Sequence, residues 1–394
     1  MKMYDVVISG AGPAGSKCAE ILAKSGFKVA LIEKDTNWRK PCGGAVNSRI
    51  FKYYPQLHKY DFHPINGMKI YSADYHNFGY KWKKVDDYSI NVDRLYFDNI
   101  LRNIAIDEGA ELFDKNLSYD FITSNNNRIG IKTKSTSGIQ EYKGNIIIIA
   151  DGMSSKLAFK SGLKNKWRIE DIMIAKCAIM EGENNIESDI ISFFFQSYKG
   201  YGWIFPLGGN KFNIGCGRLI REETNISINQ MYNNFLKDPY IKNFLPKSNY
   251  KKIWTAAYPL PSQGVNESSL YGDNIMLIGD IAGFVSPLSG EGICSGIISG
   301  KVAAETAIKA IENEDISKRT LKDYKFHPTI KKISRSYKLT LSLIDFCFEN
   351  RGQNLSKMLK IAESDEKFRE QIVEMFLLSK APQKDFIMKL KSKN

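Results

Sequence analysis

The chain has 394 residues, of which 43% are hydrophobic and 12% aromatic, so it can bury a sizeable core in two interleaved domains. No apolar run reaches the length of a bilayer-spanning helix, and the first residues enter a strand pattern that leaves no room for a secretory signal, which predicts a cytoplasmic protein. Six cysteines without a CxxC pair and four scattered histidines argue against a disulfide scaffold and predict no metal site.

The charge is strongly basic, because 56 Lys and Arg residues stand against 43 Asp and Glu residues and give a net charge of +13. Such a surface favours anionic partners, among them nucleic acid, anionic lipid head groups and phosphorylated substrates. No zinc-finger, helix-turn-helix or RNA-binding signature accompanies the charge, so we expect no nucleic acid partner. A solubilising lysine-rich surface explains the same charge equally well.

The start of the chain predicts a βαβ unit. Residues 4–10 and 28–33 are short apolar runs, and residues 13–26 between them have helical spacing that ends at Gly26. Later runs at 145–152 and 274–280 are fully apolar, which is typical of strands buried in a parallel sheet.

Other segments predict a second, β-rich unit and a helical end. Aromatic and β-branched residues alternate in 66–92 and 172–217, where a hairpin is expected to turn at 208–210. Small residues dominate a predicted helix at 289–311, and the pattern is helical and lysine-rich from about residue 329 onward.

This order predicts an α/β fold, in which a Rossmann-like nucleotide-binding domain assembled from separate pieces carries an inserted β-sheet domain and a C-terminal helical segment. The predicted boundaries are 1–65, 93–165 and 265–315 for the nucleotide-binding domain, 66–92 and 166–264 for the β-rich substrate domain, and 316–394 for the helical segment.

The turn between the first strand and the first helix, GAGPAG, predicts a dinucleotide site. Gly10 allows the tight turn, Gly12 lets backbone N–H groups approach a pyrophosphate, and Gly15 lets the helix pack closely on the strand. Glu33 ends the next strand, where it can accept hydrogen bonds from an adenosine ribose, and the helix N-terminus favours phosphate. The pattern alone does not choose NAD over FAD. The cofactor residues predicted here are Gly10, Gly12, Pro13, Ala14, Gly15 and Glu33.

Two later motifs resemble a superfamily of flavoprotein reductases and hydroxylases with a hydroxybenzoate-hydroxylase-like fold. NIIIIADGMSS resembles its DG motif, and IMLIGDIAGFVSP resembles its GD motif. The resemblance implies FAD as the cofactor, with Asp280 on the ribityl chain and Arg94, in NVDRLYFD, nearby. Taken alone, Asp280 is explained equally by a helix N-cap. The cofactor residues that this resemblance implies are Asp151, Gly152, Gly279, Asp280 and Arg94.

Within that superfamily, the segments KPCGGA, YGWIFP and GDIAGFVSPLSGEGI resemble the geranylgeranyl reductase family, over most of the chain up to about residue 310. This resemblance implies an FAD enzyme that saturates isoprenoid double bonds. Family substrates include archaeal digeranylgeranyl-glycerolipids, chlorophyll precursors and menaquinone side chains, and the first class is expected here. Further implied cofactor residues are Cys42, Gly43, Gly44, Ala45, Pro287, Gly290, Gly292 and Ile293.

The proposed chemistry explains the aromatic motif. A hydride acceptor such as an isolated alkene also needs a proton on its other carbon, so a positioned acid and an aromatic wall are expected. Tyr201, Trp203 and Phe205 alternate along a strand and face one side, where Trp203 could stabilise positive charge through its ring. Ordinary sheet core explains the same alternation. The family pattern has a proline where Tyr198 stands. The expected substrate residues are Tyr198, Tyr201, Trp203, Phe205 and Pro206, of which Tyr201 and Trp203 are also counted as catalytic.

Cys42 is the expected acid, with Cys294 as a second catalytic cysteine. A cysteine among glycine N–H groups tends toward the thiolate, which is a nucleophile and not a proton donor. Cys42 and Cys294 could instead form a disulfide controlled by the flavin or the substrate, whereas an inert core cysteine is the plain alternative. The remaining cysteines, expected in the core, are Cys18, Cys177, Cys216 and Cys347.

The turn at 287–292 is expected beside the isoalloxazine, with the following helix directing its N-terminus at the pyrimidine end. Glu291 in this turn could instead be an ordinary acid of a helix first turn.

Basic and apolar residues mix in 331–338 and 385–394, which predicts peripheral contact with anionic lipid at the inner face of the cell membrane. A solvated helix face and a frayed tail are the alternative.

Two rival functions stay open: a flavin hydroxylase or halogenase acting on a small aromatic, and a flavoprotein that passes electrons to a membrane quinone. A second GxGxxG is missing, so reduced ferredoxin, a deazaflavin and NAD(P)H are all possible electron donors.

Overall fold

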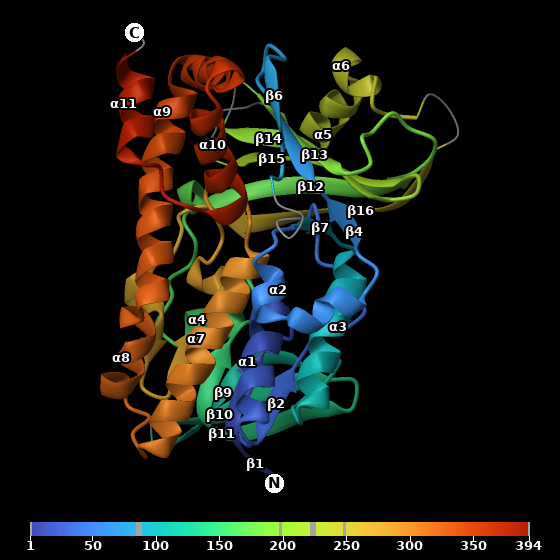
Figure 1. Cartoon of the computed structure of the whole chain (residues 1–394). Coiled ribbons are helices and arrows are strands. Elements are labelled where there is room, and N and C mark those ends of the chain that lie inside the picture. The colour runs from blue at the N-terminus through green and yellow to red at the C-terminus, as the bar shows by residue number, and fades with distance from the viewer. Residues whose placement is uncertain are drawn as a thin grey trace.

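The computed structural model describes residues 2–83, 89–125, 127–196, 199–220, 226–246 and 250–392. Two layers stand one above the other, each built on its own β-sheet (Figure 1). The N-terminus lies at the bottom of the lower layer, and the C-terminus lies at the top of the molecule.

The lower layer is built on a sheet of eight strands among the described residues. Five of them run parallel in the order β18, β11, β1, β2, β8. The βαβ unit and the two fully apolar runs predicted four of these strands, whereas β8 was not predicted. The strands are β1 (Met3–Ser9), β2 (Val29–Ile32), β8 (Glu111–Phe113), β9 (Leu117–Ser124), β10 (Asn127–Ser135), β11 (Gly138–Ile149), β17 (Tyr271–Gly272) and β18 (Ile275–Leu277).

Three helices pack together over this sheet: α1 (Pro13–Lys24), α3 (Arg94–Asp107) and α7 (Ile293–Glu312) (Figure 1). Glycines allow this close packing. A Cβ on Gly300 of α7 would lie 2.2 Å from the carbonyl oxygen of Ala14, and a Cβ on Gly15 would lie 1.9 Å from that of Gly10. The backbone of α1 is therefore pressed against both its own turn and α7.

The upper layer is a sheet of seven described strands in the order β16, β12, β15, β14, β13, β5, β6. The strands β14 and β15 form the predicted hairpin, which turns at Gly209 and Asn210. The strands are β5 (Gly67–Tyr71), β6 (Asn77–Lys81), β12 (Ile172–Glu181), β13 (Ile190–Phe195), β14 (Gly200–Gly208), β15 (Lys211–Leu219) and β16 (Lys251–Pro261).

The two faces of the upper sheet have different partners because side chains alternate along a strand. One face packs under α5 (Ile228–Lys237) and α6 (Pro239–Lys242), with Phe194, Phe212 and Ile214 among its buried residues. The opposite face looks down on the lower layer. Its downward rows are Met173, Ala175 and Cys177 on β12, Gly217 and Leu219 on β15, Tyr201, Trp203 and Phe205 on β14, and Ile191, Phe193 and Phe195 on β13.

A small three-stranded sheet and short helices join the layers. The sheet has the order β3 (Ala45–Val46), β7 (Ser89–Asn91), β4 (His63–Ile65). The helix α2 (Ile50–Tyr53) follows β3, and α4 (Lys156–Lys160) follows β11. The α/β fold with an inserted β-sheet unit is confirmed. The domain boundaries stay a prediction, and β7 pairs with β3 and β4 rather than with the upper sheet.

The C-terminal segment contains α8 (Lys318–Phe326), α9 (Pro328–Ser364), α10 (Glu366–Leu378) and α11 (Lys384–Ser392). The long helix α9 runs along both layers (Figure 1), with Tyr337 in the core of the lower layer and Leu343 in that of the upper one. Within 331–338, Lys331 and Lys338 pair with Glu267. Tyr337 is buried there, and Ile333 is half-buried, so a lipid contact by this segment would rest mainly on its basic side chains.

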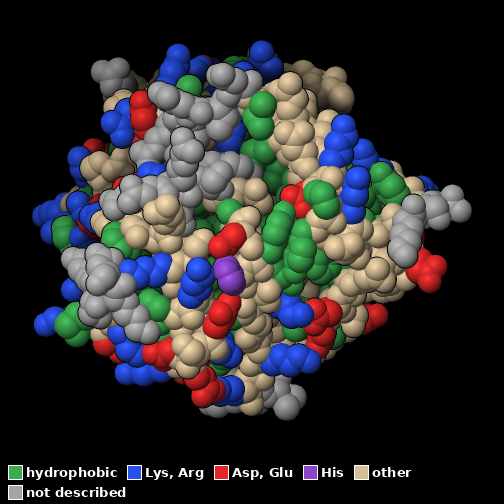
Figure 2. Space-filling model, turned by 90° about the horizontal axis from the view of Figure 1, so that it is seen from above, with side chains coloured by type: hydrophobic (Ala, Val, Ile, Leu, Met, Phe, Trp, Pro, Cys, Tyr) green, Lys and Arg blue, Asp and Glu red, His purple; other side chains and the backbone are tan. Residues whose placement is uncertain are grey.

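The face seen from above the upper layer carries no single basic patch among its described side chains. Lys and Arg are spread around the rim and mixed with Asp and Glu, and hydrophobic side chains gather in a strip near the centre (Figure 2). Among the residues that the structure describes, none of the helices has the length and apolar character that a bilayer crossing requires. Within the same ranges, His, Cys, Asp and Glu side chains form no group of three or more that could hold a metal ion.

Gly300→Ala tests the contact between α1 and α7. Its Cβ would meet the Ala14 backbone, so we expect the free energy of unfolding to fall by roughly 1–2 kcal/mol, after overpacking is offset by the better helix propensity of alanine. Urea unfolding measures the change. Gly79→Ala in β6 is the control, since its Cβ would meet only ordinary van der Waals contacts. Equal effects of the two substitutions would contradict the packing argument.

Candidate active site

One cavity of about 650 Å³ lies between the two layers. It runs from the glycine turn of β1 and α1 to the downward face of the upper sheet. All of the predicted cofactor residues line it except Gly15, which packs inside the βα turn. The lining members are Gly10, Gly12, Pro13, Ala14, Glu33, Cys42, Gly43, Gly44, Ala45, Arg94, Asp151, Gly152, Gly279, Asp280, Pro287, Gly290, Gly292 and Ile293.

The glycine turn presents bare backbone to the cavity. Gly10 has a φ of +100°, and a Cβ there would lie 2.5 Å from the carbonyl carbon of Ala150. A Cβ on Gly12 would meet no described atom within 4 Å, so this position faces open space at the N-terminus of α1. Glu33 accepts a hydrogen bond from the Ala11 N–H at 2.8 Å, which fixes its carboxylate beside the turn. Backbone N–H groups and a helix N-terminus facing open space form an anion-binding cradle.

Asp151 supplies a buried acceptor at the end of β11. The Ser9 hydroxyl donates to one carboxylate oxygen at 3.2 Å, and the other oxygen has no hydrogen-bond donor among the described residues. Burial raises the pKa of Asp151 to about 6, although the nearby Ser155 and Ser9 hydroxyls act in the opposite direction. This side chain therefore has capacity to accept a donor from a ligand.

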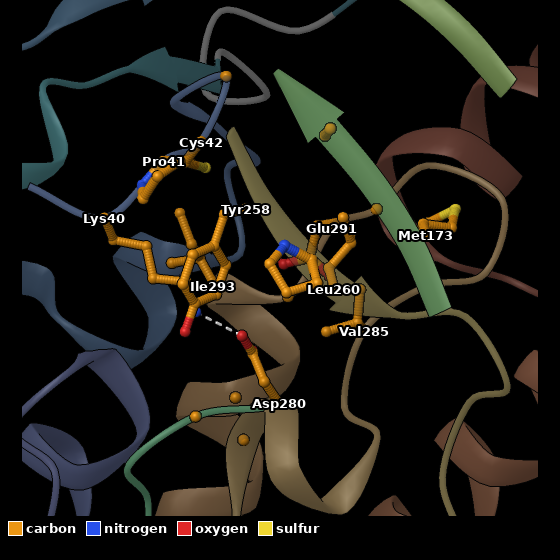
Figure 3. A pocket seen from close by; sticks show the side chains of 18 of the residues that line it. Lys40, Pro41, Cys42, Met173, Tyr258, Leu260, Asp280, Val285, Glu291 and Ile293 are labelled. Carbon is orange, nitrogen blue, oxygen red and sulfur yellow. Dashed lines mark hydrogen bonds and ion pairs between the residues drawn. The ribbon is translucent and has the colours of Figure 1, made fainter. Parts of the chain in front are cut away.

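Lys40 and Asp280 form an ion pair at the cavity wall. The Lys40 Nζ lies 2.5 Å from a carboxylate oxygen of Asp280, and Lys40 also lies over the Tyr258 ring (Figure 3). Burial disfavours the ammonium, but the Asp280 carboxylate outweighs burial, so the pKa of Lys40 lies above its ordinary value. The Asp280 side chain reaches toward Lys40 and does not cap a helix, so the alternative that Asp280 is a helix N-cap does not explain this contact.

Cys42 lies on a turn that faces the cavity, where the Gly44 N–H donates to its Sγ at 3.4 Å. Gly44 has a φ of +91°, and a Cβ there would lie 2.4 Å from the Val92 carbonyl oxygen. The carbonyl oxygen of Cys42 accepts hydrogen bonds from Asn213 at 2.9 Å and from the Cys177 thiol at 3.8 Å. The turn is thus held from both layers.

Arg94 lies next to Cys42 with its charge fixed by Asp98. Its Nε and Nη2 each donate to the Asp98 carboxylate at 2.8 Å, and both side chains are buried. Burial disfavours the guanidinium charge, but the adjoining Asp98 carboxylate favours it, and the pKa of Arg94 is raised. A permanent positive charge therefore adjoins the Cys42 sulfur.

The predicted aromatic wall lies on the cavity side of β14. Tyr201, Trp203 and Phe205 all line the cavity, as the alternation predicted. Pro206, the next residue, does not line the cavity, because it lies on the opposite face of the strand. This position does not support the predicted contact of Pro206 with substrate. Its carbonyl oxygen accepts a hydrogen bond from Asn91 at 2.6 Å. Tyr198, the fourth predicted substrate aromatic, lies outside the described residues.

The Tyr201 hydroxyl donates to the Ser289 carbonyl, which links the wall to the turn before α7. Burial raises the pKa of Tyr201, so the phenol stays protonated.

The turn before α7 holds Glu291 as a helix-end acid. Its carboxylate accepts from the Cys294 N–H at 2.6 Å and from the Ser295 hydroxyl at 2.8 Å. Glu291 precedes both the N-cap Gly292 and the first residue of α7, so it is not the first-turn acid of the alternative, and it lines the cavity. Cys294 is fully buried inside α7, where its thiol lies 4.0 Å from the Asn47 carbonyl oxygen. Cys294 does not line the cavity with Cys42, and both are free thiols in the structure.

The C-terminal helices complete the apolar end of the cavity, which the sequence did not predict. Phe376 lies 5.7 Å from Phe193 and 5.5 Å from Phe195, measured between ring centroids. Phe348 lies 6.2 Å from Phe195. The sequence predicted a helical pattern from about residue 329 but gave no partner for these residues. The lining residues from this segment are Leu341, Ile344, Asp345, Phe348, Phe376 and Leu377.

Three further residues were missed or assigned elsewhere. Cys177 was expected in the core, yet it lines the cavity beside the Cys42 turn. Lys40 belongs to the quoted motif, but nothing in the sequence indicated its Asp280 partner, which lies 240 positions away. Asn213 is an ordinary polar residue of a strand pattern, and only its alternation with Gly215 and Gly217 could have placed it on the cavity side.

Comparisons with known proteins agree with this site. The geranylgeranyl reductase catalytic domain matches residues 171–254, and the pyridine nucleotide-disulphide oxidoreductase family matches residues 4–184. A digeranylgeranylglycerophospholipid reductase of Methanococcoides burtonii is 31% identical, over 88% of this chain and 86% of its own. One of Methanosphaera stadtmanae is also 31% identical, over 82% of this chain and 80% of its own.

Solved structures share the fold. A geranylgeranyl bacteriochlorophyll reductase-like protein of Thermoplasma acidophilum has a TM-score of 0.85 and 24% identity, over 100% of this chain and 96% of its own. The flavin-dependent brominase Bmp2 has a TM-score of 0.76 and 19% identity, over 99% and 98%. At these sequence identities, the similarity shows only that the folds are alike.

The cradle, the two-layer fold and the cavity between the layers define a flavin-dependent oxidoreductase. The reductase relatives share more sequence with this chain than the halogenases do, so the hydroxylase or halogenase alternative fits less well. The chain belongs to the geranylgeranyl reductase family.

The exposure of Cys42 predicts its reactivity. All six cysteines lie in the described ranges, and Cys42 is the one that is not buried. A disulfide reagent such as DTNB is expected to titrate one thiol per folded chain and six after unfolding. Cys42→Ser should remove the fast thiol. A second fast thiol in the folded protein, or an unchanged titration in the variant, would contradict this accessibility.

The raised pKa of Asp151 predicts a pH-dependent stability. A carboxyl whose folded pKa is raised binds its proton more tightly when folded, so ionisation above about pH 6 costs stability. Asp151→Asn removes this cost. In flavin-free protein, we expect a higher Tm at pH 7.5 and a gain that disappears as the pH falls toward about 4. Asp120→Asn is the control, because Lys160 lowers the pKa of Asp120 and no gain is expected there.

Proposed function

We propose that this protein is an FAD-dependent reductase that saturates the double bonds of geranylgeranyl chains, most directly those of archaeal-type digeranylgeranylglycerophospholipids. The relatives that share 31% of its sequence carry this activity in their names. The observation that carries the proposal is the continuous cavity between the layers, which joins a dinucleotide cradle to an apolar, aromatic-walled end.

The residues present fit FAD. The open position at Gly12 leaves room for a pyrophosphate at the N-terminus of α1. Asp151 offers a carboxylate oxygen without a partner among the described residues. Glu33 stands at the end of β2, where an adenosine ribose would bind, and Asp280 stands on the opposite wall, where a ribityl chain would lie.

FAD, when bound and reduced, supplies a hydride to one carbon of the double bond. The chain itself must supply the proton for the other carbon and exclude water from the slot. Cys42 is the proposed proton donor, because its thiol lies where the cofactor residues meet the aromatic wall. Trp203, which is 6% exposed, offers its ring face to positive charge that develops on the alkene.

The apolar end of the cavity suits a polyprenyl chain. Rows from four strands of the upper sheet and residues from α9 and α10 surround it, and most of them are aliphatic or aromatic. Burial of such a chain is favourable at about 25 cal/mol per Å² of apolar surface. A small aromatic substrate would leave much of this surface without contact.

Membrane contact is part of the proposal, since the substrate is a bilayer lipid. In α11, Phe386 and Leu390 are buried, whereas Ile387 and Met388 are 37% and 54% exposed. We propose that the exposed pair contacts the inner face of the cell membrane peripherally. The electrons come from a donor outside the chain, for which reduced ferredoxin, a deazaflavin and NAD(P)H are the candidates.

Mass spectrometry of the lipid tests the function. The purified protein, loaded with FAD and reduced by dithionite, is incubated without oxygen with digeranylgeranylglycerophospholipid. Mass gains in steps of two hydrogens are expected. In Cys42→Ala, the rate of these gains should fall by about 10²-fold, which is within the range expected when a general acid is removed. Cys216→Ala is the matched control, because this buried cysteine lies on the upper face of the sheet, away from the cavity.

Equal mass gains in all three proteins would leave the reductase in place and remove the acid role of Cys42. An unchanged mass with FAD bound and reducible would reject this lipid as substrate. Quinone and chlorophyll side chains would then be tested, and failure of these too would favour electron transfer to a membrane quinone.

A further inference from the structure

Asn213 is a buried polar residue on the cavity side of β15. It is 3% exposed and pairs in register with Phe205 on β14 and Ile179 on β12. On the same side of β15 lie Lys211 at the exposed end of the strand, two glycines and a leucine, so Asn213 is the buried polar residue of that row. A buried amide is tolerated only when its donors and acceptors are satisfied.

The side chain of Asn213 joins two functional elements. The Trp203 Nε1–H donates to Asn213 Oδ1 at 2.9 Å, and the Asn213 Nδ2–H donates to the Cys42 carbonyl oxygen at 2.9 Å. The chemistry of the partners fixes the orientation of the amide, because an indole nitrogen only donates and a carbonyl only accepts. One amide therefore connects the Cys42 turn of the lower layer with the aromatic wall of the upper layer.

Packing around this link leaves little room for movement. A Cβ on Gly43 would lie 2.7 Å from the Phe205 ring and 3.1 Å from Trp203 Nε1. On the other side of the indole, a Cβ on Gly215 would lie 2.2 Å from the Trp203 ring. Glycines thus let the turn and the strand close on the indole, while its polar edge is held by Asn213.

We propose that Asn213 is a positioning residue that fixes the Cys42 turn and the Trp203 ring relative to one another. The proposal deepens the reductase function above and rests on it for the effect on turnover. Among side chains of the length of asparagine, an amide is the group that carries both a donor and an acceptor. Aspartate has the same shape and keeps the acceptor for Trp203, but it presents a second oxygen to the Cys42 carbonyl in place of a donor.

The decisive variant is therefore Asn213→Asp, and Asn274→Asp is its matched control. Asn274 donates to the carbonyls of Arg128 and Asn145 in the lower layer and does not line the cavity. Both substitutions turn an amide donor into an acceptor beside backbone carbonyls. Only the first is expected to release the Cys42 turn.

Three measurements are made on the FAD-loaded protein: the rate of Cys42 labelling by DTNB, the FAD content, and the kcat and KM for the lipid. Asn213→Asp is expected to change the labelling rate several-fold and to lower kcat by about 10²-fold, since small misplacements of reacting groups have effects of this size. KM should stay within about threefold, because the apolar surface that binds the chain is intact. Asn274→Asp should change none of these.

The outcomes separate this proposal from the proposed function. An altered labelling rate in Asn213→Asp with no lipid reduction in the wild type would support the link and reject the substrate. Labelling and kcat that match those of Asn274→Asp would overturn the positioning role. If the charged variant does not fold, Asn213→Ala removes the amide without adding charge, and unchanged labelling in that variant overturns the proposal equally.

Discussion

The turn at Cys42 has to touch both layers at once, and the rest of the site depends on this constraint. Gly43 can carry no side chain, since a Cβ would lie 2.7 Å from Phe205 of the upper sheet. Gly44 requires a left-handed backbone beside Val92 of the lower layer. With the turn in this place, the cofactor cradle and the apolar wall become two ends of one cavity rather than two separate clefts.

The parts of the site that the sequence predicted are those fixed by local backbone geometry. The glycine turn at 10–15 follows a strand and opens a helix, and its function needs only that context. The aromatic row of β14 follows from the two-residue period of a strand, which also places Pro206 on the other face. The fully apolar runs at 145–152 and 274–280 contain strands of the parallel part of the lower sheet, as expected for strands buried on both faces.

The remaining parts depend on partners that are distant in sequence. Lys40 contacts Asp280 from 240 positions away in the sequence, and Asn213 contacts the Cys42 carbonyl from 171 positions away. Cys177 reads as an ordinary apolar strand residue and is buried, yet its thiol faces that turn. The flavin-dependent halogenases share the same two-layer fold, so the difference in chemistry must come from contacts of this kind, which local patterns do not record.

The position of α9 has a consequence for how the protein is made. During synthesis, the N-terminal parts of a chain emerge and fold first. The apolar rows of the upper sheet are complete by residue 219, but the residues of α9 and α10 that cover them, such as Phe348 and Phe376, follow much later. Until then, a nascent chain on the ribosome exposes an aromatic surface, which is a binding site for chaperones and a starting point for aggregation.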